Sequence, residues 1–400
     1  MASSDPNPSM EARRAALVAE LREKGIPLPP PIERAFLTVP RHLFVPGVYL
    51  DAVYRDQVIV TKRDKEGVAV SSSSQPAIMA IMLDALEVQE GHRVLEIGAG
   101  TGYNAALLAE LVGTAGQVTT MEIDDEIAEA AEAHLKRAGY SGVQVIAGDG
   151  AAGYPPNAPY DRIICTASVW DLPVAWEEQL RVGGILVTPL SFAGIQLGAS
   201  LRKLPDGSLE SQRLFPLGFI SLKGEASGPE RAVRVAGSAL RVGMSGEIRV
   251  DEAQIHTLLS DDHELAQLPL ELESHKLGQF SYYLLFHQPA DYQFITYQVE
   301  EGQMAYGLQG VGWGILSSTS ACLLSYGNER VCNVYGGADA YLTLVELAEQ
   351  WNREGEPGPE QGHLRVTPAG REPYTPPEPA AVRVFVRPTH NYTLWMPRRP

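Results

Sequence analysis

The sequence is poor in cysteine and in positive charge, and it has no long apolar run. Its three cysteines, Cys165, Cys322 and Cys332, are too few and too scattered for a disulfide framework or a zinc cluster. Lysine and arginine total 32 against 49 aspartates and glutamates, a net charge of −17, which argues against a broad nucleic-acid surface because such surfaces need basic patches. No run approaches the roughly 20 apolar residues of a membrane span, and the N-terminus lacks the apolar segment of a secretion signal. We therefore expect a cytoplasmic protein without a metal, nucleic-acid or membrane partner.

The apolar pattern predicts two regions of different texture. Four hundred residues, 44% of them hydrophobic, exceed the usual size of one domain. After a helix over residues 9–24 and a proline-rich stretch, short apolar strands alternate with helices from Pro76 to Pro189. That alternation is typical of a doubly wound, mainly parallel α/β sheet. Beyond a small, polar segment at Lys223–Arg231, the pattern becomes α+β, and no catalytic motif is evident there.

A glycine-rich turn follows the strand expected over Arg93–Ile97. The stretch VLEIGAGTGY has the form strand, acid, Gly-x-Gly-x-Gly, helix, and its glycines allow a close approach of the backbone to a ligand. Dinucleotide enzymes use G-x-G-x-x-G instead, with a pyrophosphate at the helix N-terminus. Here Glu122 ends the next strand, where a carboxylate can accept hydrogen bonds from ribose hydroxyls, and Asp149 in Gly-Asp-Gly can meet an adenine amino group. Three acids around one loop also suit a sulfonium cation.

These features predict S-adenosylmethionine as the cofactor, with an α/β domain carrying an incidental glycine loop as the alternative. Glu96 is the acid before the loop, and it either contacts the cofactor or orients the loop, while Tyr103 either lines the site or is core. The predicted cofactor-binding set is Glu96, Gly98, Ala99, Gly100, Thr101, Tyr103, Glu122, Ile123, Asp149 and Gly150.

A serine run precedes the helix expected over Pro76–Leu86. Proline fits the first turn of a helix, and the serines and Gln75 can supply capping oxygens. Backbone amides at a helix N-terminus bind anions, so the natural acceptor is a carboxylate. A carboxylate is ionised at neutral pH and needs no general base to be methylated, only alignment with the donor. We predict Ser74, Ser73 and Ser72 as the acceptor-side residues, and a serine-rich surface loop with an N-cap is the alternative.

Other residues carry weaker signals. For His42, and for Cys165 on a buried strand, packing is the favoured interpretation. The aromatic band Tyr282–Tyr297 is either a peptide-binding surface or a set of core strands, and Trp170 follows a strand at the edge where α/β sites open.

Residues from about Ile32 to Leu222 resemble protein-L-isoaspartate O-methyltransferases. The resemblance is carried by VPRHLFVP, Tyr54 with Arg55–Asp56, SQP, VLEIGAGTGY, GDG, APYDRIICTA and RVGGILVTP. It implies a class I, Rossmann-like methyltransferase fold and methyl transfer from S-adenosylmethionine to the carboxylate of isoaspartate. The methyl ester then closes to a succinimide with loss of methanol. It also implies that Ser74, the serine of SQP, lies at the acceptor.

Two departures from the family bear on the substrate. The usual Thr-Ile-Ser before Gln-Pro is Ser72-Ser73-Ser74 here, and the chain continues for about 175 residues beyond the methyltransferase region. Extended relatives of this kind resemble enzymes that accompany ribosomally made, modified peptides such as lanthipeptides and graspetides, where an aspartate in a cyclised precursor peptide becomes an aspartimide. We favour that substrate, with repair of isoaspartyl proteins and a non-catalytic peptide-binding module as alternatives.

The predicted domains are a helical extension over 1–30, a methyltransferase domain over 31–225 and an α+β accessory domain over 231–400 that recognises substrate. The oligomeric state is left open.

Overall fold

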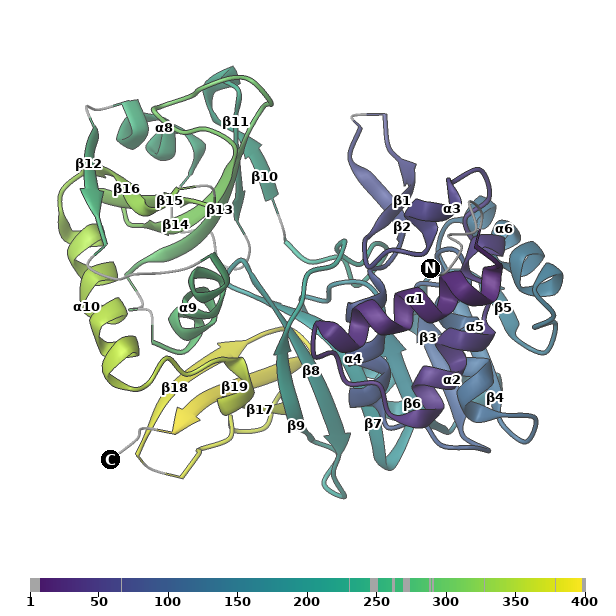
Figure 1. Ribbon diagram of the computed structural model, residues 1–400. Coiled ribbons are helices and arrows are strands. Elements are labelled where there is room, and N and C mark those ends of the chain that lie inside the picture. The colour runs from purple at the N-terminus through teal and green to yellow at the C-terminus, as the bar shows by residue number, and fades with distance from the viewer. Residues whose placement is uncertain are drawn as a thin grey trace. The chain divides into compact units, whose positions relative to one another are not determined.

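The chain forms two compact units in the computed structural model (Figure 1). The described residues are 8–65, 67–229, 231–244, 251–260, 263–268, 274–287, 289, 291–326, 328–377 and 379–397. The first unit contains Met1–Pro189, Ala199–Arg213 and Phe219–Ser227, and the second contains Leu190–Gly198, Leu214–Gly218 and Gly228–Pro400. Residues 1–7 of the predicted N-terminal extension lie outside the described residues.

The first unit is built on a parallel sheet, as the alternating pattern predicts. Strand β3 pairs in parallel with β4 on one side and β6 on the other, while β5 and β7 extend the sheet outward. The chain therefore reverses its direction of winding at β3, and in open α/β sheets ligands bind at the carboxyl ends of the strands at such a point. The elements that lie wholly or mostly in this unit are β3 (Arg93–Ile97), α5 (Tyr103–Val112), β4 (Gln117–Glu122), α6 (Asp125–Arg137), β5 (Gln144–Ala147), β6 (Tyr160–Cys165), α7 (Val174–Gln179), β7 (Leu180–Phe192), β8 (Ile195–Lys203) and β9 (Leu209–Pro216).

Local sequence explains these elements. Strand β3 is buried after its first residue, as a central strand covered by helices must be, and Glu96 is the charged residue among the buried ones. Helix α6 has Asp124 at its N-cap, where the side chain accepts a hydrogen bond from the Ile127 amide, and it has acids in its first turn and bases in its last. Strand β9 ends at Pro216, since proline has no amide to donate to a ladder.

Helices and a hairpin precede the sheet in the chain. Helix α1 (Met10–Glu23) packs on α2 (Pro30–Thr38), and α2 packs on α4 (Pro76–Leu86) and α5, so these helices cover one face of the sheet (Figure 1). The short η1 (Arg41–Leu43) and α3 (Leu50–Val53) lead into an antiparallel hairpin of β1 (Ile59–Arg63) and β2 (Ala69–Ser73). Ser71, Ser72 and Ser73 of the serine run therefore lie on a strand, and Ser74 follows it.

The second unit is α+β, as expected. Its larger sheet is antiparallel in every described pairing, with the order β10-β11-β13-β14-β15-β16-β12, and it has its own apolar core around Val242, Ile295, Leu323 and Tyr335. Strand β19 pairs with β17 and β18 in a second antiparallel group. The strands are β10 (Arg231–Arg234), β11 (Leu240–Met244), β12 (His263–Gln267), β13 (Gln293–Val299), β14 (Val311–Leu316), β15 (Ser320–Ser325), β16 (Asn328–Gly336), β17 (His363–Pro368), β18 (Ala380–Val386) and β19 (His390–Pro397). The helices are α8 (Glu252–Ser260), α9 (Ser274–His287) and α10 (Asp339–Arg353).

The aromatic band predicted at Tyr282–Tyr297 divides between two elements. Its first part lies on helix α9 and its last part on strand β13. Tyr283 and Tyr297 are buried, so packing accounts for both. Among the described residues, no helix is long and apolar enough to cross a membrane.

Candidate active site

The glycine loop lies at the carboxyl end of β3 and is held from two sides. The amides of Gly98 and Ala99 both donate to the Met121 carbonyl at 2.9 Å, which ties the loop to β4. The Thr166 hydroxyl donates to the Gly98 carbonyl at 2.8 Å. Gly98 has a φ of +95°, and a Cβ on it would lie 2.6 Å from the Thr166 hydroxyl oxygen. Glycine is therefore required there, and Thr166, which is not among the predicted site residues, fixes the loop.

Glu122 lies beside this loop. One carboxylate oxygen of Glu122 accepts from the Gly100 amide at 2.9 Å, and the other accepts from the Asp124 amide at 3.3 Å. Each carboxylate oxygen has two lone-pair directions, so both can accept a further hydrogen bond from a ligand. The neighbouring Ile123 is 41% exposed. The predicted roles of Glu122 and Ile123 as cofactor ligands are compatible with this position.

Asp149 lies at the end of β5 in a second turn. Its carboxylate accepts from the Ala151 amide at 2.9 Å and from the Glu225 amide at 2.8 Å. Gly150 is buried, and a Cβ on it would lie 2.5 Å from the Ile97 side chain at the end of β3. The Gly-Asp-Gly turn and the glycine loop therefore meet at the same edge of the sheet.

Glu96 occupies an interior position that differs from those of the other two acids. It is fully buried, accepting from the Asn104 side-chain amide at 2.7 Å and from the Thr120 hydroxyl at 2.6 Å. Burial raises the pKa of Glu96 to about 7. These contacts link β3, β4 and α5 beneath the loop, so they favour the orienting role over direct contact with the cofactor.

Three other residues of the predicted cofactor-binding set, Ala99, Thr101 and Tyr103, pack inside the first unit. Ala99 and Thr101 are buried, and the Thr101 carbonyl lies 3.1 Å from His134 Nδ1. Tyr103 is buried, its ring 5.7 Å from the Arg41 guanidinium and in edge contact with Phe36. Of the two interpretations of Tyr103, core packing is the one that these contacts favour.

The serine strand meets the glycine loop through the backbone. Ser72 pairs with Val60 and Ser73 with Ile59 in the hairpin. The Ser72 carbonyl oxygen lies 3.4 Å from the position of a Cβ on Gly100, so the two segments are in van der Waals reach. Ser73 is 3% exposed, whereas Ser74, after the strand, is only partly buried.

Arg41 holds the end of this strand. Its guanidinium is fully buried and donates to the Ser74 carbonyl at 3.0 Å and to the Ser73 hydroxyl at 3.4 Å. It also donates to the carbonyls of Val53, Arg55 and Gln57. The sequence signal for this role is a charged residue inside the otherwise apolar VPRHLFVP segment.

Lys62 fixes the other strand of the hairpin. Its ammonium group binds the Asp124 carboxylate at 2.6 Å and the Glu126 carboxylate at 2.9 Å, at the start of α6. Asp124 follows Glu122 by two residues, so the acceptor hairpin is tied to the segment that carries the predicted ribose ligand.

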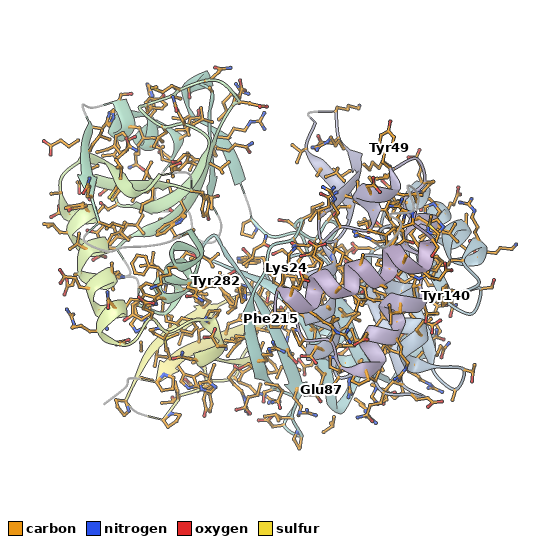
Figure 2. The ribbon with its side chains drawn as sticks, viewed as in Figure 1. Lys24, Tyr49, Glu87, Tyr140, Phe215 and Tyr282 are labelled. Atoms are coloured by element: carbon orange, nitrogen blue, oxygen red, sulfur yellow. The ribbon has the colours of Figure 1, made fainter. Side chains whose placement is uncertain are left out.

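The cap of α4 differs from the one expected. Gln75 stands at the N-cap position but makes no side-chain cap bond, and the serines do not supply one. Asp56 does so instead, accepting from the Ala77 amide at 2.8 Å and from the Gln75 side chain at 2.9 Å. Lys24, at the end of α1 (Figure 2), binds the same carboxylate at 2.8 Å. Burial alone raises the pKa of Asp56, but the hydrogen bonds from Lys24, Ala77 and Gln75 outweigh it and lower the pKa.

Two other candidates are engaged in packing. His42 Nδ1 lies 2.7 Å from the Tyr54 hydroxyl, and burial lowers the pKa of His42. Cys165 is fully buried, as expected of a core residue. Within the part of the chain that the structure describes, no group of three or more His, Cys, Asp or Glu side chains forms a metal site.

Comparison with known proteins identifies one family, which is the one that the sequence resembles. The family model described as protein-L-isoaspartate(D-aspartate) O-methyltransferase matches residues 12–227, more than half of the chain. The chain is 40% identical to the protein-L-isoaspartate O-methyltransferase of Ignicoccus hospitalis over 214 residues, 53% of this chain and 98% of the relative. It is 40% identical to that of Methanopyrus kandleri over 213 residues, 53% of this chain and 92% of the relative. A solved structure named protein-L-isoaspartate O-methyltransferase is similar with a TM-score of 0.51 and 25% identity, covering 88% of this chain and 96% of the other.

Proposed function

The chain belongs to the protein-L-isoaspartate O-methyltransferase family, and we propose that it methylates a side-chain carboxylate of an isoaspartyl or aspartyl residue, with S-adenosylmethionine as the donor. The observation that carries this proposal is the approach of Ser72 to Gly100. Because the Ser72 carbonyl lies 3.4 Å from the Cβ position of Gly100, the serine strand and the glycine loop lie next to each other. A donor and an acceptor held on these two segments are neighbours.

The residues around the loop fit S-adenosylmethionine. Gly98 and Gly100 have φ values of +95° and +51°, so no side chain stands between their backbone and a ligand. Glu122 and Asp149 present carboxylate oxygens at the same edge of the sheet, suited to ribose hydroxyls, to an adenine amino group and to a nearby positive charge. When bound, the cofactor supplies an electrophilic methyl group.

The chain's own residues have to bind and align the acceptor. The acceptor carboxylate is already ionised at neutral pH, with a reference pKa of about 4, so its oxygen attacks without a general base. The Ser74 hydroxyl is the group that we assign to hydrogen bonding with this carboxylate. Arg41 holds the Ser74 carbonyl and thereby sets the position of the residue. The contribution of these residues is proximity and orientation.

Ser74→Ala tests the assignment. Loss of one hydrogen bond to a charged group corresponds to a fall of about 10- to 100-fold in kcat/KM, while the Kd of S-adenosylhomocysteine stays within about 2-fold. Methyl-ester formation on an isoaspartyl peptide measures the first quantity, and calorimetry measures the second. Ser141→Ala, an exposed serine between α6 and β5, is the matched control. Equal losses of activity and of cofactor affinity would show that Ser74 is structural.

Two substrate classes fit this activity. Isoaspartyl residues of damaged proteins are supported by the named relatives, whose length the chain nearly spans. An aspartate in a cyclised ribosomal precursor peptide, giving an aspartimide, is supported by the polar run Ser72-Ser73-Ser74. The second unit does not separate them, because a solved structure bearing the family name matches 88% of this chain.

The two classes are distinguished by competition. The chain is offered an unstructured isoaspartyl peptide and a cyclic aspartyl peptide of the same composition, and kcat/KM is measured for each by mass spectrometry. Preference for the isoaspartyl peptide supports repair, and preference for the cyclic aspartyl peptide supports peptide modification. If the chain binds no S-adenosylhomocysteine in calorimetry, both fail and a non-catalytic peptide-binding module takes their place.

A further inference from the structure

The segment Phe219–Ser227 runs along the edge of the sheet where the site lies. The Ser168 amide donates to the Ile220 carbonyl at 2.8 Å, and the Leu222 amide donates to the Ser168 carbonyl at 2.7 Å. These two bonds form a parallel bridge between Ser168 and Ser221, just after β6. The segment is therefore anchored to the carboxyl end of the sheet before it reaches Lys223.

At Gly224 this segment comes against Asp149. The Glu225 amide donates to Asp149 Oδ2 at 2.8 Å. A Cβ on Gly224 would lie 2.2 Å from Asp149 Oδ2 and 2.6 Å from its Cγ, closer than any real contact, and the φ of Gly224 is +88°. Both the space and the backbone conformation therefore demand glycine at this position.

We propose that Gly224 and the Glu225 amide complete the base-binding part of the cofactor site, and that Gly224 determines the preference for adenine. This inference rests on the proposed function, in which Asp149 accepts from the adenine amino group. The Ala151 and Glu225 amides engage one oxygen each of Asp149, and each oxygen keeps one lone-pair direction for a ligand. Two fixed donors hold the carboxylate in one orientation, so its oxygens can accept from an amino group and reject a carbonyl.

Replacement of Gly224 disturbs this arrangement in a specific way. A methyl group at residue 224 forces Asp149 to rotate or the segment to withdraw, and either movement removes the Glu225 amide from the carboxylate. The expected loss is selective for the base, because Glu122 and the glycine loop belong to other elements.

The experiment compares wild type, Gly224→Ala and Gly139→Ala. Gly139 has a φ of +90° with nothing within 4 Å of its Cβ position, so Gly139→Ala introduces the same backbone strain away from the site. Calorimetry gives Kd for S-adenosylhomocysteine and for S-inosylhomocysteine, in which a carbonyl replaces the amino group. We expect wild type and Gly139→Ala to prefer the adenosyl compound by about 10- to 100-fold. Gly224→Ala should bind it about 10-fold more weakly and lose most of that preference.

The outcomes separate the inference from the proposed function. If Gly224→Ala prefers S-adenosylhomocysteine over S-inosylhomocysteine as strongly as wild type does, the inference is overturned and the proposed function stands. If wild type binds neither compound, the inference and the proposed function are both overturned. If Gly224→Ala does not fold, hydrogen exchange in the wild type decides. S-adenosylhomocysteine should slow exchange over residues 219–227, and unchanged exchange there overturns the inference.

Discussion

The buried carboxylate of Glu96 should make the free energy of unfolding depend on pH. Glu96 is fully buried, and burial raises its pKa from 4.5 to about 7. Because the folded state holds the proton more tightly than the unfolded state, stability is full below pH 4.5 and falls as pH rises toward 7. A shift from 4.5 to about 7 corresponds to about 3 kcal/mol once both states are ionised, at about 1.4 kcal/mol per pH unit.

Glu96→Gln removes this titration and keeps the hydrogen bonds. The carbonyl of the substituted side chain can accept from Asn104, and its amide can donate to the Thr120 hydroxyl oxygen, which replaces the two bonds of the wild type. The free energy of unfolding of the variant should therefore rise relative to wild type by about 2.5 kcal/mol between pH 5 and pH 8. Urea unfolding followed by circular dichroism across this range measures the difference.

Two results would refute the reasoning. A difference between the proteins that stays within about 0.5 kcal/mol from pH 5 to pH 8 would mean that Glu96 is ionised at little cost. A loss of S-adenosylhomocysteine affinity beyond about 10-fold, the scale of a lost charged hydrogen bond, would mean that Glu96 binds the cofactor and does not only orient the loop. Glu129→Gln, an exposed carboxylate on α6, is the control for removing one negative charge.

Two further predictions concern the hairpin that carries the serines. Arg41→Lys should lower the free energy of unfolding by about 2–4 kcal/mol, since one ammonium group cannot reach the five oxygens that the guanidinium contacts. Urea unfolding measures this, and kcat should fall while the Kd of S-adenosylhomocysteine stays within about 2-fold. Lys62→Gln should lower kcat/KM a few fold and abolish part of its dependence on salt, because the ion pairs to Asp124 and Glu126 are solvent-accessible and screened. Steady-state rates over a NaCl series test this, with Lys62→Arg retaining the wild-type dependence.

The central sheet could be predicted from sequence because its apolar runs leave few alternatives. Strand β3 and helix α4 have the bounds that the pattern predicts. In β3 a mainly apolar segment, which contains Glu96, ends at Gly98, and in α4 a proline opens a mainly apolar segment that ends before the left-handed Glu87. Here local propensity, burial and chain punctuation agree, which is the condition for reliable prediction.

The hairpin could not be predicted because its strands lack that agreement. Serine is a weak strand former, and only Ser71 and Ser73 are buried in β2. Its partner β1 has one buried residue, Ile59, so no period of two stands out. Tertiary contacts hold the hairpin. Arg41 donates to the Ser74 carbonyl after β2, and Lys62 of β1 binds the Asp124 carboxylate. Contacts between residues far apart in sequence leave no local trace.

The same limit explains the prediction about the helix α4. From the sequence alone, the amides at its N-terminus are predicted to bind the substrate carboxylate, because no acidic residue lies close to Pro76 in the sequence. In the fold, Asp56 lies there, 21 residues before the Ala77 amide that it accepts from. A second carboxylate at about 4 Å from Asp56 would be repelled by about 1–4 kcal/mol at dielectric constants between those of water and a protein surface. Lys24 offsets only part of this, since it already binds Asp56 and Glu20. We therefore propose that the substrate carboxylate binds at Ser74 and not at the Ala77 amide, which Asp56 occupies.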